Sequence, residues 1–175
     1  MKRAAAAIVT LVLTGCASAP PAGPAPRACG LAEFGEAPGI MLPNPPAKKN
    51  PTSDKSAPAQ VAAPFEVGKG TGEAGKWYDA APGWKAWRLW LRSDASRTMS
   101  VHLQPFDLPA GAELWVCAPD GTTRQGPIGG RGPAGSGEFW SATARGPEIW
   151  LEVLVPARDK DAVKLAVDKA FGGLR

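Results

Sequence analysis

The stretch Ile149-Trp150-Leu151-Glu152-Val153-Leu154-Val155 decides the fold. Its odd-numbered positions are all aliphatic, while Trp150, Glu152 and Leu154 hold the even-numbered ones. Because successive side chains of a β-strand point to opposite faces, this alternation predicts a strand with one aliphatic face. The same pattern recurs at four other places, and most weakly at the last of them: residues 87–92, 99–104, 114–117 and 164–167.

Turn signals separate these runs. Glycine, proline and aspartate gather between them, and Asp120-Gly121 predicts a hairpin. The single helix candidate, residues 158–162, allows one turn at most. Short alternating strands with Gly/Pro turns are typical of sandwiches and barrels. We therefore expect an all-β fold: an antiparallel β-sandwich, jelly-roll-like, preceded by a disordered Pro-rich tether.

Three tryptophans form the most suggestive group of side chains. Trp90, Trp115 and Trp150 all fall on the parity opposite to the aliphatic residues of their strands. If these strands share one sheet, the rings form an aromatic face that can stack on sugars or act as a protein hot spot. The alternative is that this face is buried as well, under residues 61–83. We take the three tryptophans as a candidate binding face.

The N-terminus carries a targeting signal. Lys2 and Arg3 precede a short apolar run, which ends at Leu13-Thr14-Gly15-Cys16. A run of about ten residues is too short to span a bilayer and predicts a signal peptide over residues 1–15. Leu-Thr-Gly-Cys resembles the lipobox of bacterial lipoproteins, which implies a lipid on Cys16. The alternative is an ordinary signal peptide with a chance cysteine.

The resemblance to lipoproteins implies a location. The mature chain would begin at Cys16 and contact the membrane only through its N-terminal lipid. Ala17 and Ser18 follow, and an Asp, which often signals retention at the inner membrane, is missing there. We therefore expect a lipid-anchored protein of the bacterial cell envelope, at the outer membrane.

Charge and cysteine content exclude several classes of function. The net charge is +4, and removal of Lys2 and Arg3 leaves 4 − 2 = +2, which does not favour nucleic acid as a partner. Cys29 and Cys117 remain once Cys16 is assigned to lipid. In an oxidising compartment they are a disulfide candidate, and the alternative is two free thiols. Two cysteines and one histidine do not complete a tetrahedral zinc site, so we expect no metal and no cofactor.

Residues 16–60 differ from the rest of the chain. Residues 17–60 hold ten of the nineteen prolines and one aromatic residue, Phe34, so this segment lacks the apolar area needed to fold. We expect a lipidated linker that reaches roughly 140 Å when fully extended. Residues 61–83 form a transition that can supply an added strand, and residues 84–175 form the sandwich.

Residues 84–172 resemble the accessory β-sandwich domain that precedes the protease domain in bacterial lysyl-endopeptidase-like, trypsin-like serine proteases. The segments on which this resemblance rests are, in chain order, Trp87-Arg88-Leu89, 106–112, Leu114-Trp115-Val116, 119–121, 137–141, 149–152 and Val155-Pro156. The resemblance implies a sandwich fold with Trp87 and Trp140 in its core. A protease domain would follow in that family, but this chain ends at Arg175. We therefore do not expect protease activity.

Side chains that support catalysis are scarce. The only histidine, His102, lies in the middle of a predicted strand on the side opposite its aliphatic face. We expect it to be a surface residue, and Gly135-Ser136-Gly137 to be a flexible loop rather than a nucleophile motif. Asp159 and Asp161 flank a lysine and are typical of an exposed turn rather than of a cation site. The sequence predicts a protein that is not an enzyme.

The expected function is that of a non-catalytic envelope lipoprotein that presents a β-sandwich as a binding module. Its partner would be a protein or a glycan. One alternative is a regulator that acts in trans on a secreted trypsin-like protease, as an inhibitor or a chaperone. A further alternative is a structural spacer without a specific ligand.

Overall fold

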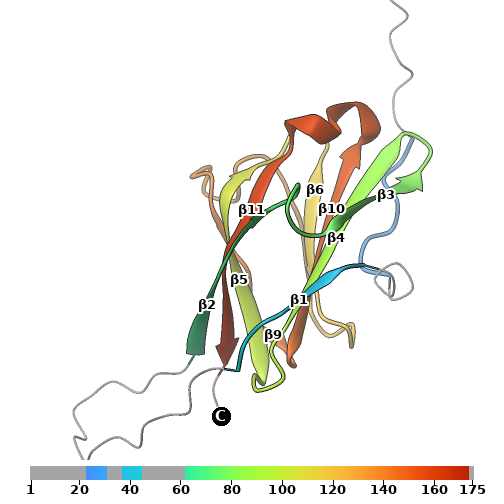
Figure 1. Cartoon of the computed structure of the whole chain (residues 1–175). Coiled ribbons are helices and arrows are strands. Elements are labelled where there is room, and N and C mark those ends of the chain that lie inside the picture. The colour runs from blue at the N-terminus through green and yellow to red at the C-terminus, as the bar shows by residue number, and fades with distance from the viewer. Residues whose placement is uncertain (1–22, 31–36, 45–61, 174–175) are drawn as a thin grey trace, which may run out of the picture.

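The structure is a computed structural model that describes residues 23–30, 37–44 and 62–173. These residues form eleven strands and one short 3₁₀ helix, and the strands make two sheets packed face to face (Figure 1). The fold is an all-β sandwich, as the alternating segments predict. Cys16 and the signal peptide over residues 1–15 lie outside the described residues.

The first sheet has the order β1-β4-β10-β6-β7, and β3 pairs with the part of β4 that β1 leaves free. Its central strand β10 contains the stretch that decides the fold. All its pairings are antiparallel except the one between β1 and β4. Its strands are β1 (Gly39–Met41), β3 (Lys76–Ala81), β4 (Trp84–Arg92), β6 (Glu113–Cys117), β7 (Arg124–Ile128) and β10 (Glu148–Pro156).

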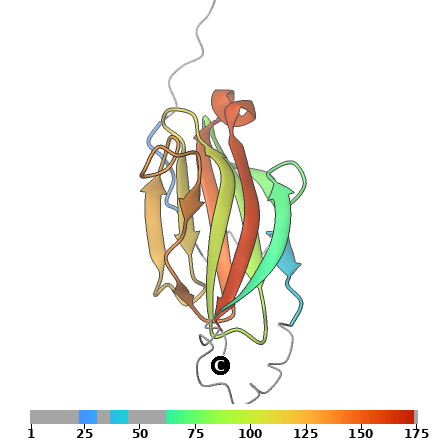
Figure 2. The same ribbon diagram turned by 90° about the vertical axis from the view of Figure 1, so that its left-hand side faces the viewer.

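The second sheet has the order β2-β11-β5-β8, and β9 pairs with another part of β5; Figure 2 views the sandwich from this side. The 3₁₀ helix η1 (Ala157–Ala162) leads from β10 into β11 and therefore from one sheet to the other. It occupies the single helical turn predicted at 158–162. The strands are β2 (Ala62–Gly70), β5 (Thr98–Asp107), β8 (Phe139–Trp140), β9 (Ala144–Arg145) and β11 (Lys164–Gly173).

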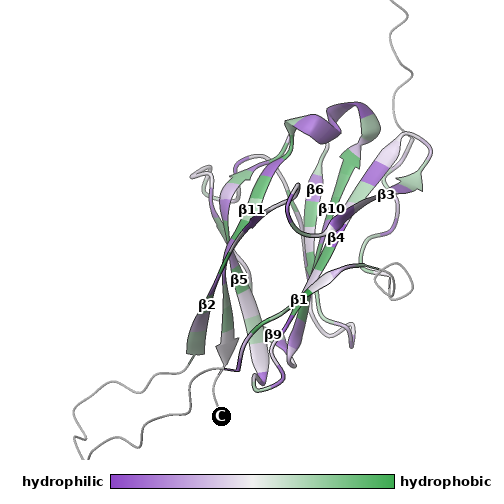
Figure 3. Ribbon diagram, in the orientation of Figure 1, coloured by the Kyte–Doolittle hydropathy of each residue, from purple (hydrophilic) through white to green (hydrophobic). Residues whose placement is uncertain are grey.

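The core lies between the two sheets and uses the predicted aliphatic faces. Leu89 and Leu151 of the first sheet and Val101 and Leu103 of the second are all at most 1% exposed. In Figure 3 hydrophobic and hydrophilic positions follow each other along these strands, while η1 carries hydrophilic residues. Trp87 is fully buried, and its indole N–H donates to the carbonyl of Ala74 at 2.9 Å. The expectation that Trp87 belongs to the core is confirmed.

The ordered structure begins earlier than the predicted boundary at residue 84. Residues 62–81 supply β2 and β3, so the transition segment contributes two strands. Residues 37–44 also contribute β1, although they lie inside the expected linker. We call the described residues 23–30 and 37–44 the N-terminal strap. These residues are too few to build a core of their own. Ala28, 3% exposed, packs against Trp84, Ala86 and Leu154 of the first sheet, whereas Leu42, 6% exposed, joins the core between the sheets.

Candidate functional site

The three tryptophans of the predicted binding face do lie together. Across the first sheet, Trp90 of β4 is opposite Trp150 of β10, which in turn is opposite Cys117 of β6. Trp115 lies in the next row, opposite Glu152. The shared parity therefore places all three rings on the outer face of one sheet.

This face is largely covered rather than open, which agrees with the alternative that the face is buried as well. Trp150 is only 8% exposed, and Trp90 and Trp115 are half-buried. The N–H of Trp90 donates to the carbonyl of Ala37 at 2.9 Å, a residue of the strap. Cover by residues 61–83 is wrong, because β2 belongs to the other sheet and β3 lies beside β4 in the sheet plane. The strap supplies the cover.

A disulfide and a buried ion pair hold the strap in place. Cys29 and Cys117, for which the sequence left a disulfide and free thiols open, form a disulfide. The backbone N–H of Cys29 also donates to Glu152 at 2.8 Å. On its other oxygen Glu152 accepts a hydrogen bond from Nε of Arg88 at 2.7 Å. Gly39 passes so close to Trp90 that an added Cβ would clash with the ring.

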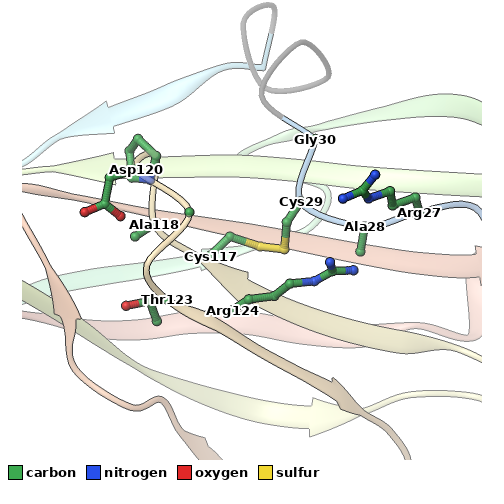
Figure 4. A pocket seen from close by; sticks show the side chains of 11 residues that line it. Arg27, Ala28, Cys29, Gly30, Cys117, Ala118, Asp120, Thr123 and Arg124 are labelled. Carbon is green, nitrogen blue, oxygen red and sulfur yellow. A yellow bond between two sulfur atoms is a disulfide. The ribbon is translucent and has the colours of Figure 1, made fainter.

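A cavity of about 490 Å³ opens beside this disulfide (Figure 4). Its wall carries the guanidinium groups of Arg27 and Arg124 but also the carboxylate of Asp120. Asp120 accepts hydrogen bonds from the backbone N–H of Thr122 at 2.9 Å and from its hydroxyl at 2.7 Å. These two bonds hold the pKa of Asp120 below its ordinary value, and the bond from the backbone N–H has the larger effect. The wall therefore combines both signs of charge and is not a dedicated anion site.

The exposed aromatic surface lies instead on the outer face of the second sheet. Trp140 of β8 is paired with His102 of β5, and its ring stacks on the imidazole with 4.1 Å between centroids and 25° between planes. Trp140 is 57% exposed, whereas His102 beneath it is 5% exposed. The expectations that Trp140 belongs to the core and that His102 is a surface residue are both wrong. Phe139 takes the inward position, so its neighbour Trp140 must point outward.

Two carboxylates hold His102. Its Nδ1 lies 2.9 Å from Asp168 Oδ2, and its Nε2 lies 3.3 Å from Glu138 Oε2. The register of β11 shifts between Val167 and Lys169, so Asp168 occupies a bulge that turns its side chain toward His102. Both nitrogens face carboxylates, which leaves neither to accept a proton from a serine.

Phe171 of β11 extends the aromatic surface. Its ring centroid lies 5.5 Å from that of Trp140, with 35° between the planes, and the residue is half-buried. We call Trp140, His102 and Phe171, together with the carboxylates of Glu138 and Asp168, the Trp140 platform. The sequence signal for it was available: Glu138 and Trp140 flank the core residue Phe139 and therefore share the outward parity.

Within residues 23–30, 37–44 and 62–173, no helix has the length and hydropathy of a membrane span. The same residues contain no group of three metal-ligating side chains placed to hold an ion. Comparison of the chain with protein-family models, with curated proteins and with solved structures found no match.

Proposed function

We propose that this chain is a non-catalytic lipoprotein of the bacterial envelope that presents its β-sandwich as a binding module. The binding surface is the Trp140 platform rather than the strap-covered face of Trp90, Trp115 and Trp150. One observation carries the proposal: a large aromatic ring is exposed to solvent and is also held in one orientation by a buried, hydrogen-bonded histidine.

Trp140 combines exposure to solvent with a fixed orientation, as a binding anchor requires. Among the described residues, the large hydrophobic side chains that are exposed are Met41 and Trp140. Tryptophan is enriched among residues that dominate binding energy, because it offers a large contact area with few rotatable bonds to fix. Stacking on His102 removes much of the remaining freedom of the ring. The platform therefore has little conformational entropy to lose on binding.

The location in the envelope rests on two supports. The first is the lipobox-like Leu13-Thr14-Gly15-Cys16, which makes Cys16 the acceptor of the lipid. The second is the disulfide between Cys29 and Cys117, since disulfides persist in the periplasm and at the cell surface rather than in the cytosol.

Site-specific photo-crosslinking tests the proposed surface. The full chain, with its own signal, is expressed with benzoylphenylalanine at Gln104, an exposed residue two positions along β5 from His102. Benzophenone inserts into C–H bonds of proteins and glycans alike, so the readout does not presume the class of partner. We expect an adduct that disappears when Trp140→Ala is added.

The matched control places the same probe at Met41, the exposed residue at the edge of the first sheet. Its adducts should not depend on Trp140. If the Gln104 probe gives no Trp140-dependent adduct while the protein is exported and folded, the binding role is wrong and a spacer remains.

A further inference from the structure

We propose that the Trp140 platform binds a glycan by stacking the indole on the face of a pyranose ring. The inference rests on the proposed function, because it names the class of ligand that the same surface takes. It follows from the orientation of the indole, from the hydrogen-bond acceptors beside His102 and from the size of the aromatic surface.

The orientation of the indole leaves one flat face free. Trp140 lies nearly parallel to His102, and its exposed fraction of 57% therefore belongs mainly to the face turned away from the sheet. The π face of an aromatic ring is electrically negative, and the C–H bonds on one face of a pyranose are weakly positive. A ring held edge-on would not offer this contact, whereas a ring held flat does.

Hydrogen-bond acceptors lie beside the imidazole on which the indole stacks. Glu138 and Asp168 each direct one oxygen to His102, and their side chains are 42% and 36% exposed. Within the described residues, no further hydrogen bond occupies the second oxygen of either carboxylate. Sugar hydroxyls donate well to carboxylates, because hydrogen bonds to charged groups are the stronger ones. The edge of the platform thus suits a ligand rich in hydroxyl donors.

The size of the aromatic surface argues against a protein as the ligand. A stable protein interface buries about 800 Å² on each partner and has several buried anchors. The platform provides one exposed indole with the half-buried ring of Phe171 at 5.5 Å. That extent matches one sugar ring on Trp140 and an adjoining sugar near Phe171, so we expect an oligosaccharide to bind better than a monosaccharide.

Fluorine NMR of the full chain in detergent, labelled with 5-fluorotryptophan, tests this inference. The Trp140 resonance is assigned as the one missing in Trp140→Phe. The probes are chitotetraose, cellotetraose and maltotetraose, which differ in linkage and in N-acetylation. We expect the Trp140 resonance to shift saturably with at least one of them, while the resonance of the buried Trp87 stays in place.

Variants separate the platform from the rest of the surface. Trp140→Ala should weaken binding at least about tenfold, as truncation of a stacking anchor does. Glu138→Gln with Asp168→Asn should weaken it several-fold, and Met41→Ala should leave it unchanged. Affinity for the sugar should not change between low and high salt, since no opposite charges are joined.

Three results would overturn the glycan assignment. The first is the absence of a saturable shift with all three probes, and the second is equal affinity of Trp140→Ala. The third is a shift produced instead by Nα-acetyl-lysine amide, whose side chain is cationic, with an affinity that falls as the salt concentration rises. That result would identify a cation site. If the crosslinking experiment then gave a Trp140-dependent adduct with a protein, the proposed binding module would stand and only the glycan assignment would be refuted.

Discussion

The backbone N–H of Cys29 donates a hydrogen bond to the carboxylate of Glu152 at 2.8 Å, across 123 residues of sequence. This bond joins the strap to the central strand of the first sheet. Glu152 is fully buried, and its other oxygen is held by Arg88, which is 8% exposed. A buried carboxylate is stable only when its oxygens are bonded. The strap thus supplies the hydrogen bond to the second oxygen of Glu152, whereas Arg88 of the sheet binds the first.

Replacement of Glu152 by alanine should therefore be costly. It leaves the guanidinium of Arg88 buried without its carboxylate and releases the N–H of Cys29. We expect a loss of about 3–5 kcal/mol in the free energy of unfolding, measured by urea denaturation. Glu66→Ala is the matched control, since its ion pair with Lys169 is exposed and should contribute less than about 1 kcal/mol. Equal losses for the two variants would contradict a special role for Glu152.

Removal of the disulfide should loosen the strap. The bond closes a loop with a sequence separation of 88 residues, and Cys29→Ala with Cys117→Ala should cost about 2–5 kcal/mol. The hydrogen bonds of the strap to Trp84 and Trp90 would then open more often. Acrylamide quenching of tryptophan fluorescence should rise in the double variant. Unchanged quenching and stability would show that the strap is held without the disulfide.

The two tryptophans that the family resemblance placed in the core should behave oppositely. Trp87→Ala removes a fully buried ring and should destabilise the protein by about 3–5 kcal/mol. Trp140→Ala removes a ring that is largely in solvent and should cost less than about 1 kcal/mol. Thermal or chemical denaturation of both variants measures the difference. A large loss for Trp140→Ala would instead assign the ring a structural role.

The hairpin at Asp120 should show a small acid sensitivity. Hydrogen bonds from Thr122 lower the pKa of Asp120 below its ordinary value near 3.8. Because the folded pKa is the lower one, this contribution to stability is present above pH 3.8 and is lost as the pH falls through the folded pKa. Thr122→Ala should raise the pKa only in part, since the backbone hydrogen bond is the larger cause. NMR titration of the carboxyl carbon decides this, and an unchanged pKa would exclude the hydroxyl as a cause.

The lipid proposed on Cys16 is directly measurable. If its thiol is the lipid acceptor, as proposed, Cys16→Ser should yield a soluble or unprocessed protein in cell fractionation. Intact-mass analysis of the wild-type protein should find a lipid mass on a chain that begins at Cys16. An unmodified N-terminus at another position would refute the assignment.

Local pattern was enough to predict much of the fold. Alternation placed Leu151 and Val153 on the buried face and Trp150 on the opposite one, because side-chain direction in a strand depends only on parity. Asp120-Gly121 lies in the β6–β7 turn, and η1 occupies the single predicted helical turn. These features depend on residues that are close together in the sequence, so they can be predicted from it without knowledge of the fold.

The strap and the Trp140 platform depend on contacts between distant parts of the chain. The proline-rich composition around Cys29 favoured an irregular linker, and nothing local indicates that this segment lies on Glu152. The carboxylate of Asp168 reaches His102 only through a bulge, which the alternation of residues 164–167 does not reveal. Trp140 was the avoidable error, since its parity relative to Phe139 placed it outside.

The strap also limits how far the sandwich could lie from a bilayer if the proposed lipid on Cys16 is present. With Gly23 bound by Trp84, seven peptide links join that point to Cys16, or about 25 Å when extended. If Cys16 carries the lipid as proposed, this short connection keeps the Trp84 end of the sandwich near the lipid headgroups. A protease that cuts within residues 45–61 would not release it, because the disulfide keeps both fragments joined. Release by a cut in this segment would therefore require reduction of the disulfide as well.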